Sequence, residues 1–409
     1  MTTSITRSFL RPLGPSEQYF WLSNQNSAKH FVIAAEIIGD ATVEAWVSAV
    51  AAAQLRHPLL RISIQSGPDG APCFHEHANI PIPLRIVPEE VFAAWQVEMA
   101  KELATPIPVS GAPLARITLL RRSGGSTLLL AMHHSIADGL SSAFVIRDIL
   151  EALSGKPLQP LSLPEPQENL CSVAAEPPPS SAPVYPPATL LRRDAGGPTV
   201  QALKLSQELT MKLRTHAREV GATVHGALVA AFTFAGRQLA FDWLTRPVRV
   251  VSPVNNRKVL GLEDQCALSI IFPTGAYAPD SEEQLWDVAR AVKDELTPVR
   301  TAQGLSTVFS GFRQLMSASP DIGQIAAFEL QVCACEGMVS NLGLLPFETN
   351  FGGFTLESLW GPSVFVGIEG EQMIGAGTLN GAIHLLHTSY TPIPKLLQTM
   401  EATLKAMAH

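Results

Sequence analysis

The sequence predicts an α/β fold made of two halves that are joined by a proline-rich stretch. Helix-like and strand-like hydrophobic patterns alternate on both sides of residues 154–198, as they do in mixed α/β domains. The chain has 409 residues, of which 46% are hydrophobic, so each half can bury a core of ordinary domain size. We therefore expect one domain at residues 1–153, a linker or crossover at 154–198, and a second domain at 199–409.

The first half mixes helices with strands. Residues 41–55 are rich in alanine and begin next to Asp40 and Thr42, either of which can cap a helix. Residues 61–65 alternate between apolar and polar side chains as a half-buried strand does. A buried strand is expected at 126–132, because this short run is almost entirely apolar. Further helices are expected at 92–103 and 140–150.

The proline-rich stretch separates this pattern from a similar one in the second half. Pro177-Pro178-Pro179 and Pro186-Pro187 exclude a regular helix or a central strand there. Beyond it, strands are expected at 200–205, 249–252, 328–339, 361–367 and 381–390, and helices at 207–221, 225–240, 284–296 and 392–408. Trp360 and Phe365 are expected in the core.

Charge, hydropathy and cysteine usage exclude several classes of protein. The net charge of −7 gives no reason to expect binding to nucleic acid or to an anionic membrane surface. No apolar run reaches the length of a membrane span, and residues 1–7 lack the apolar stretch of a signal peptide. The five cysteines form no zinc spacing and no Cys-x-x-Cys pair, and Cys333 and Cys335 are expected along a buried strand. These features predict a reduced, cytoplasmic protein.

The most informative segment is His133-His134-Ser135-Ile136-Ala137-Asp138-Gly139, which follows the strand expected at 126–132. Neighbouring side chains of an extended chain point to opposite faces, so both histidines cannot face one cavity from that strand. One can act as a base while the other packs behind it. A histidine pair alone is more often structural. A metal site is not expected, because no further ligand lies at a recognisable spacing.

The complete pattern His-His-x-x-x-Asp-Gly resembles the signature of the acyl-CoA-dependent acyltransferase superfamily. This superfamily includes condensation domains of nonribosomal peptide synthesis, polyketide-associated acyltransferases and alcohol acyltransferases. Other segments are similar to family elements and occur in family order, at residues 13–22, 55–61, 222–231, 252–257 and 340–343. Pro58 replaces the usual Glu of one element, and the Asp-Phe-Gly-Trp-Gly motif of the plant branch is absent. The resemblance therefore favours the polyketide-associated and alcohol branches.

This resemblance implies a fold and an activity. The fold is two chloramphenicol-acetyltransferase-like α/β domains in one chain, with an active-site tunnel between them. The activity is transfer of an acyl group from a thioester donor, acyl-CoA or an acyl carrier protein, to an alcohol, which forms an ester in lipid or polyketide-type secondary metabolism. We expect no bound cofactor, a monomer, and an acyl carrier protein as a candidate partner.

The resemblance also assigns roles to residues of the histidine motif. His134 is the candidate general base, which takes the proton of the acceptor and returns it to the departing thiolate. His133 belongs to the motif, but its expected role is structural, since its face opposes that of His134. Gly139 permits a close approach of the backbone, and its N–H is a candidate donor to the developing oxyanion.

Other residues have more than one interpretation. Asp138 is either a second catalytic acid or, as the family suggests, the partner of an arginine. Arg61 is the first choice for that arginine and Arg257 the second. Asn255 and Asn341 are candidate substrate-binding residues, or they only shape turns. His225 is a weaker candidate, because a histidine at a helix start more often packs or caps.

Three functions remain open at this point. The first is the O-acyltransferase described above. The second is a free-standing condensation enzyme that joins an amine to a carrier-bound acyl group. The third is a non-catalytic member that binds an acyl carrier, although the intact His134 and Asp138 argue against it. A serine hydrolase is disfavoured, because no Gly-x-Ser-x-Gly elbow occurs in the chain.

Overall fold

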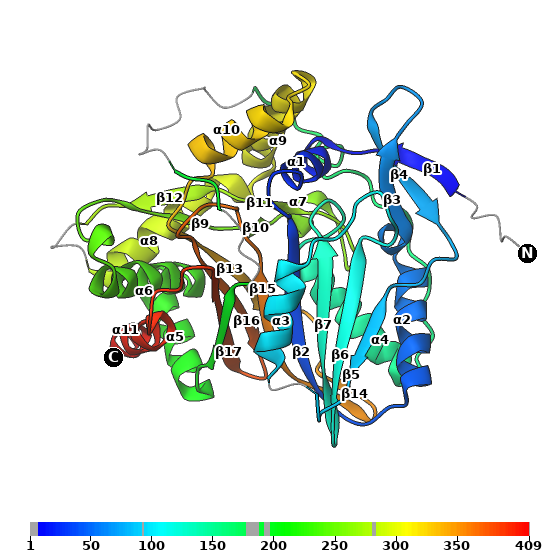
Figure 1. Ribbon diagram of the computed structural model, residues 1–409. Coiled ribbons are helices and arrows are strands. Elements are labelled where there is room, and N and C mark those ends of the chain that lie inside the picture. Colours follow the sequence, from blue (N-terminus) through cyan, green and yellow to red (C-terminus); the bar gives the residue numbers. More distant parts are fainter. Residues whose placement is uncertain (1–6, 92–93, 177–187, 192–196, 280–283, 409) are drawn as a thin grey trace, which may run out of the picture.

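The computed structural model describes residues 7–91, 94–176, 188–191, 197–279 and 284–408. Two six-stranded mixed sheets stand side by side, each with helices packed against it (Figure 1). The predicted α/β class and the arrangement in two lobes are therefore confirmed. We call these the N lobe and the C lobe.

The sheet of the N lobe has the histidine motif at the end of a central strand. Its strands, in spatial order, are β14 (Asn350–Phe351), β15 (Phe354–Ser363), β2 (His30–Ile38), β7 (Gly125–His133), β6 (Ala115–Arg122) and β5 (Leu84–Val87). Every residue of β7 is buried, since β2 and β6 pair with it on either side. This burial explains the mostly apolar run and confirms the strand expected at 126–132.

Helices of the N lobe cover this sheet and set the position of the motif. The helices α2 (Val43–Arg56) and α4 (Gly139–Leu153) pack together on one face, and α3 (Trp95–Ala104) lies against β2 and β7 (Figure 1). Thr42, rather than Asp40, caps α2 by accepting from the N–H of Ala45. A small sheet of β1 (Arg7–Pro12), β4 (Pro72–His77) and β3 (Ile62–Ser66) lies at the edge of the lobe, next to the 3-10 helix Pro58–Arg61.

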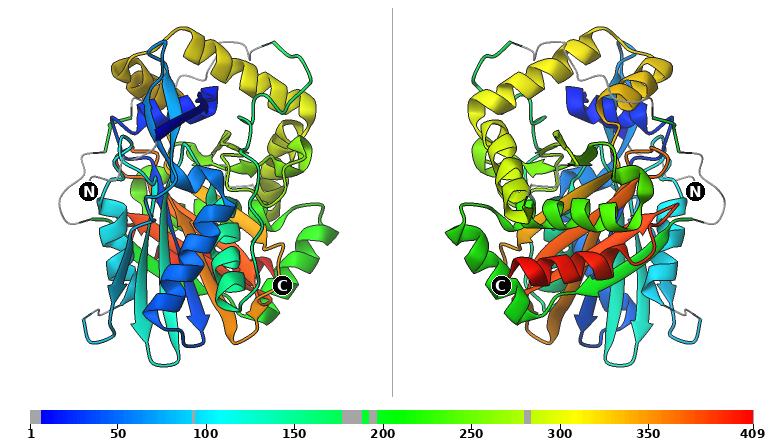
Figure 2. Two further views of the ribbon diagram at one scale, coloured as in Figure 1. Left: turned by 90° about the vertical axis from the view of Figure 1, so that its right-hand side faces the viewer. Right: turned by 90° about the vertical axis from the view of Figure 1, so that its left-hand side faces the viewer.

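The C lobe repeats this plan with a different strand order. Its strands are β12 (Thr274–Tyr277), β9 (Val248–Val251), β13 (Gly337–Leu344), β16 (Gln372–Leu379), β17 (Ala382–Ser389) and β8 (Thr199–Lys204). The helices are α5 (Gln207–Glu219), α6 (Val224–Leu239), α8 (Leu285–Leu296) and α11 (Leu396–Met407). In side view, α6 and α11 cover the outer face of this sheet (Figure 2).

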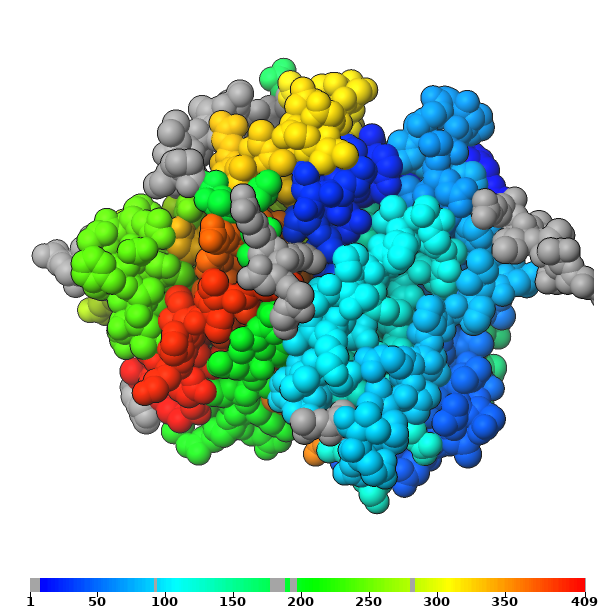
Figure 3. Space-filling model, in the orientation of Figure 1, coloured from blue at the N-terminus to red at the C-terminus, as the bar shows by residue number. Residues whose placement is uncertain are grey.

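The two lobes are not built from strictly separate halves of the chain. The strands β14 and β15 come from the second half, yet β15 pairs antiparallel with β2 in the N-lobe sheet. The lobes meet where β15 passes β16: a β-carbon built on Gly375 would lie 2.3 Å from the carbonyl oxygen of Pro362. In the space-filling view, the first half of the chain, in blue and cyan, lies beside the green and red C lobe (Figure 3).

A third group of elements lies over the end of the two sheets. It comprises α1 (Pro15–Ser23), α9 (Ala302–Ser317) and α10 (Ile322–Val332), and α1 contacts both of the other helices (Figure 1). Nearby are the short strands β10 (Val254–Asn255) and β11 (Ile270–Ile271), the one-turn helix α7 (Arg257–Leu260) and the 3-10 helices Phe241–Trp243 and Pro298–Arg300.

Two of the expected strands are wrong in position. The strand expected at 328–339 begins only at Gly337, because residues 328–332 complete α10. Cys333 and Cys335 therefore lie in the buried connection between α10 and β13 and not along a strand. The strand expected at 361–367 is the end of β15 and stops at Ser363.

The proline-rich stretch is described only in part. Residues 154–176 have no regular helix or strand, as expected, apart from a turn at 167–170. The two proline clusters at 177–179 and 186–187, and residues 1–6 of the N-terminus, lie outside the described residues. Leu190 forms an isolated bridge with Ile368 of the C lobe.

Within the described part of the chain, no single helix is long and apolar enough to cross a membrane. The helices α5 and α6 pass that test only when taken together, and the break between them bends them by 105°.

Candidate active site

A largely apolar cavity lies between the lobes and contains the histidine motif. From the N lobe and α1 it is lined by Tyr19, Phe20, Lys29, His134, Asp138, Gly139 and Leu140. From the second half of the chain it is lined by Val251, Pro253, Asn255, Ile270, Phe272, Glu329, Cys333, Met338, Ser340, Asn341, Leu342, Pro362, Val364, Phe365 and Val366. The wall therefore needs both halves, as the expected tunnel does.

His134 is held with one ring nitrogen engaged. Its Nδ1 lies 3.0 Å from the carbonyl oxygen of Ala137. A carbonyl can only accept, so Nδ1 carries the proton of the neutral ring and Nε2 carries the lone pair. Within the described chain, Nε2 makes no hydrogen bond. The turn after β7 thus presents a free proton acceptor to the cavity.

The surroundings keep this ring neutral. Its plane stacks on Phe20 with the ring centroids 4.6 Å apart, and Phe31 packs beside it. Burial lowers the pKa of His134 to about 4, even though the nearby carboxylate of Asp138 acts to raise it. At neutral pH, His134 is therefore in the form that can accept a proton.

His133 points away from the cavity. It is fully buried at the end of β7, opposite His30 of β2, and it does not line the cavity. Its Nδ1 accepts from the backbone N–H of Ser135 at 3.1 Å. Burial lowers the pKa of His133 to about 3, so the ring is neutral. The contact shapes the turn that carries His134, which agrees with a structural role.

Asp138 is paired with Arg257, and Arg61 was the wrong first choice. Arg257 Nη1 lies 2.7 Å from Asp138 Oδ2, and both side chains are almost fully buried. Arg61 instead binds Glu76, at 2.9 Å within the N lobe. The short 3-10 helix that carries Arg61 directs it toward β4, away from the motif.

The other contacts of Asp138 are also structural. Its Oδ1 accepts from the N–H of Ser141 and so caps α4, while its Oδ2 also accepts from the N–H of Ser269. With these bonds and Arg257, both oxygens are occupied. No hydrogen bond joins Asp138 to His134 in the described structure, so Asp138 fixes the backbone next to the base.

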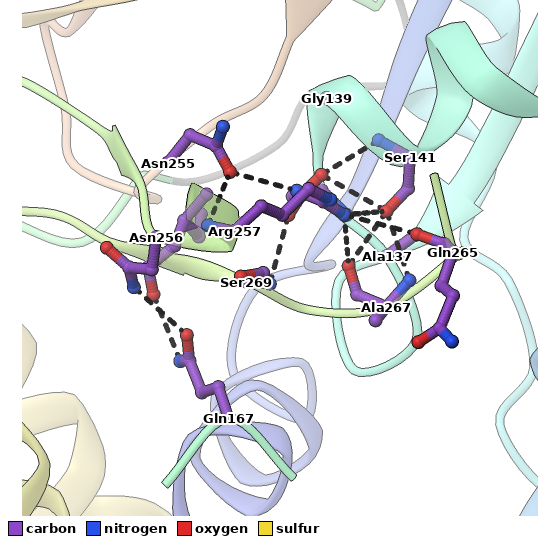
Figure 4. Close-up of polar contacts among 12 residues, drawn as sticks. Ala137, Gly139, Ser141, Gln167, Asn255, Asn256, Arg257, Gln265, Ala267 and Ser269 are labelled. Atoms are coloured by element: carbon purple, nitrogen blue, oxygen red, sulfur yellow. Dashed lines mark hydrogen bonds and ion pairs between the residues drawn. The ribbon is translucent and has the colours of Figure 1, made fainter. Parts of the chain in front are cut away.

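Hydrogen bonds of Arg257 and Asn256 also hold the segment around α7 against the N lobe. Arg257 Nη2 donates to Ser141 Oγ at 2.7 Å and to the carbonyl of Ala267 at 3.0 Å (Figure 4). Asn256 donates to Gln167 of the proline-rich stretch at 3.1 Å (Figure 4). These bonds join three distant parts of the chain around the motif.

A second group of ion pairs and hydrogen bonds holds the same segment against the N lobe at Asp264 and Cys266. Asp264 binds Arg56 at 3.1 Å and Arg147 at 2.5 Å, from α2 and α4. His57, whose Nε2 lies 2.7 Å from Asp148, accepts from the N–H of Cys266. His57 belongs to the family-like sequence element at 55–61. This element therefore helps to hold the segment after α7 against the N lobe.

Gly139 lies where the two lobes approach most closely at the motif. A β-carbon at this position would lie 2.7 Å from Pro362 Cγ and 3.0 Å from Leu342 Cδ2, both on the C-terminal side of the cavity. Its N–H, at the first position of α4, has no acceptor among the described residues. Glycine is therefore required sterically, and it lines the same cavity as His134 with an N–H that no described residue accepts.

The three candidate substrate-binding residues differ in position. Asn255 and Asn341 line the cavity, and each side chain also accepts from a nearby backbone N–H, of Arg257 and Gly343. His225 does not line this cavity. It is buried at the start of α6 with its Nε2 2.9 Å from Ser252 Oγ, because the helix start packs against β9.

Several cavity residues were not expected from the sequence. Lys29 lies far from Glu329 and Cys333 in the chain, and none of the three belongs to a recognisable motif. Tyr19 and Phe20 fall within the family-like element at 13–22, which signals that this segment matters but not that it meets α10. Phe365, expected in the core, is buried and also lines the cavity.

Comparison with known protein families agrees with this geometry. Residues 13–167 match the family described as the condensation domain. Residues 194–300 match the C-terminus of phthiocerol/phthiodiolone dimycocerosyl transferase. The first part of the chain is therefore similar to condensation domains, and the matched part of the second half is similar to the C-terminus of an acyltransferase.

Curated relatives are much longer than this chain. It is 31% identical to tyrocidine synthase 3 of Brevibacillus parabrevis over 210 residues, which are 46% of the chain and 3% of that protein. It is 25% identical to bacitracin synthase 2 of Bacillus licheniformis over 264 residues, or 56% of the chain and 10% of that protein. The chain spans only a small part of these relatives.

Solved structures show the same fold over the whole chain. Polyketide synthase associated protein 5 from Mycobacterium tuberculosis has a TM-score of 0.66 at 19% identity and covers 98% of each chain. Trichothecene 15-O-acetyltransferase from Fusarium sporotrichioides has a TM-score of 0.68 at 12% identity and covers 100% of this chain and 96% of that one. The predicted chloramphenicol-acetyltransferase-like architecture of two lobes is confirmed.

Proposed function

We propose that this protein is an acyltransferase, that it moves an acyl group from a thioester donor to an alcohol to form an ester, and that His134 is the general base. The observation that carries the proposal is the free Nε2 of a neutral histidine that faces an interlobe cavity. Because Nδ1 is fixed on the carbonyl of Ala137, the lone pair of Nε2 has one direction in which to act.

The reaction balances without a covalent enzyme intermediate. Nε2 of His134 takes the hydroxyl proton as the acceptor oxygen attacks the thioester carbon. The carbonyl oxygen becomes an oxyanion, and the free N–H of Gly139 is the donor that we assign to it. When the C–S bond breaks, the proton passes from His134 to the thiolate. The products are an ester and a free thiol.

The donor and the pathway are proposed from the relatives. Acyl-CoA and an acyl carrier protein both end in a pantetheine thioester, which is the shared chemistry that the reaction needs. The names of the relatives, which are synthases of tyrocidine and bacitracin and a polyketide synthase associated protein, support a role in secondary metabolism. An acyl carrier protein is thus a candidate partner.

Amide formation is the second candidate function. The match to the condensation domain over residues 13–167 favours it, since this is the part that contains the motif. The match of residues 194–300 to a transferase C-terminus favours the ester instead. Comparing the rates with an alcohol and an amine acceptor of matched structure distinguishes ester formation from amide formation.

The test is release of free thiol from a panel of acyl-CoAs and acyl carrier thioesters with alcohol and amine acceptors. Wild type is compared with His134→Ala and with His216→Ala, a partly exposed histidine on α5, as control. We expect acceptor-dependent release that falls by about 10² to 10⁴ in His134→Ala only. Release that survives in folded His134→Ala would contradict the assignment of the base.

A further inference from the structure

The helix α1 contacts the turn that carries His134 at two points. The ring of Phe20 stacks on the ring of His134, with the centroids 4.6 Å apart and the planes inclined by 16°. One turn earlier in α1, the carbonyl oxygen of Glu17 accepts a hydrogen bond from the hydroxyl of Ser135 at 3.0 Å. Phe20 and His134 both line the interlobe cavity. The surroundings of the candidate base are therefore completed by a helix outside its own sheet.

The hydrogen bond of His134 fixes one nitrogen but not the plane of the ring. Nδ1 lies 3.0 Å from the carbonyl oxygen of Ala137, and the imidazole can rock about that contact. The ring of Phe31, on β2, is inclined to it by 45° at a centroid distance of 4.7 Å. Of the aromatic rings that contact His134 within the described chain, only that of Phe20 lies nearly parallel to it. Phe20 is therefore the residue that limits rotation of Nε2.

The ring of Phe20 also keeps water away from one face of His134. Phe20 and His134 are 7% and 6% exposed. An aromatic face attracts a cation, so stacking alone would favour the protonated imidazole. Burial has the larger effect, because it lowers the pKa of His134 to about 4. The charges nearest the ring act in opposite directions, since Asp138 raises this pKa and Lys29 lowers it.

The position of Phe20 is set from the other side of α1. Its neighbour Tyr19 packs against three aromatic rings at centroid distances of 5.7, 5.5 and 6.1 Å, those of Phe272, Phe312 and Phe328. Phe312 lies on α9 and Phe328 on α10. These two helices, which come from the second half of the chain, thus hold α1 and the ring of Phe20 in place against His134.

We propose that Phe20 is a positioning residue for the base, whose ring holds the imidazole of His134 with Nε2 directed at the acceptor hydroxyl and shields the imidazole from water. This inference rests on the proposed role of His134 and adds a residue that acts through it. Phe20 itself takes no proton and forms no bond. A base displaced from its reactive geometry by a fraction of an ångström loses much of its effect on the rate.

Three substitutions test this role. Phe20→Ala removes the ring, whereas Phe20→Tyr keeps its flat face. Phe312→Ala is the matched control, because it removes an aromatic partner of α1 that makes no ring contact with His134. If Phe20→Ala does not fold, Phe20→Leu takes its place, since leucine fills the space but offers no flat face. Phe20→Leu is then judged by the position of the His134 proton and by kcat.

The first measurement is a nitrogen-15 NMR titration of the His134 ring, which needs no turnover. The signals are assigned by their absence in His134→Ala. In wild type, Phe20→Tyr and Phe312→Ala, we expect the proton on Nδ1 only and a midpoint near 4. In Phe20→Ala, we expect the proton to exchange between the two nitrogens. The midpoint there should rise by about one pH unit or more, because water reaches the ring.

The second measurement is kcat and KM for thiol release at pH 7.5, where His134 is neutral in wild type. A loss of kcat at this pH reports orientation and not protonation. We expect kcat to fall by about tenfold or more in Phe20→Ala, with a smaller change in KM. Phe20→Tyr and Phe312→Ala should keep most of the wild-type kcat.

Three outcomes would overturn the proposal. The first is folded Phe20→Ala with the proton position, midpoint and kcat of wild type. The second is an equal change in Phe312→Ala, which would mean that loosening of α1 in general is responsible. The third is folded Phe20→Tyr that behaves as Phe20→Ala does. Thiol release that is unaffected in His134→Ala, with an altered titration in Phe20→Ala, would instead reject the proposed base and leave the effect of Phe20 on the ring standing.

Discussion

Arg257 Nη1 lies 2.7 Å from Oδ2 of Asp138, and this pair joins the C lobe to the first turn of α4. Asp138 also caps α4 and binds the N–H of Ser269, so one carboxylate holds three segments together. His134 is four residues away, and its Nδ1 is fixed on Ala137, the residue before Asp138. The ion pair therefore positions the turn that carries the base, while the base itself makes no bond to Asp138.

Replacing Arg257 by Ala should destabilise the fold strongly. The buried carboxylate of Asp138 would lose its charged partner, which costs about 3–5 kcal/mol in comparable sites. The measurement is the free energy of unfolding in urea. Arg122→Ala is the control, because its ion pair with Glu357 is half-exposed and should cost about 1 kcal/mol or less. Equal losses in the two variants would contradict the role given to Asp138.

Replacing Gly139 by Ala should lower both stability and turnover. The new β-carbon would lie 2.7 Å from Pro362 Cγ, so α4 or β15 must shift. Overpacking of this kind costs about 1–3 kcal/mol, and the shift moves the N–H that we assign to the oxyanion. Thermal unfolding and kcat are compared with those of Gly111→Ala, where the nearest atom is 3.9 Å away. Full kcat in Gly139→Ala would contradict the oxyanion assignment.

The strand and helix around the motif could be predicted from local pattern, whereas the wall of the cavity could not. The strand β7 is a mostly apolar run and α4 begins at a capping Asp, so both have local signals. The crossing of β15 into the N-lobe sheet depends on pairing with β2, more than 300 residues earlier. No periodicity encodes such a pairing. The choice between Arg61 and Arg257 for Asp138 failed for the same reason.

The position of α10 shows a second limit of local pattern. Residues 328–339 are mostly apolar and include Cys333 and Cys335, which suits a buried strand. The structure divides them between the last turn of α10, a connection and β13, because α10 packs on α1. Glu329 becomes a cavity residue only through that packing.

The free energy of unfolding should fall as the pH drops from about 6.5 toward 4. Burial lowers the pKa of five histidines, to about 3 for His133 and about 4 for His134, His225, His384 and His387. Because the unfolded chain binds these protons first, each histidine removes about 1.4 kcal/mol of stability per pH unit inside this window. Glu371, whose pKa is raised to about 7, acts in the opposite direction and offsets part of the loss.

Urea unfolding at pH 7.5 and 5.5 measures this loss. The variant His225→Asn removes one of the five groups without touching the cavity, so its stability should depend less on pH than that of wild type. An equal free energy of unfolding at the two pH values would show that these histidines are not held neutral by burial.

The pH dependence of kcat/KM should show the lowered pKa of His134 separately from those of the other histidines. With its pKa lowered to about 4, His134 stays neutral through pH 5.5, and a base is active only in its neutral form. The rate should therefore be flat from pH 7.5 to 5.5 and fall as the pH approaches 4. Circular dichroism at each pH, and recovery of the rate after return to pH 7.5, separate protonation from unfolding. A midpoint near the ordinary histidine value of about 6.5 would mean that the ring is solvated when the thioester reacts, so that the cavity opens to water during turnover.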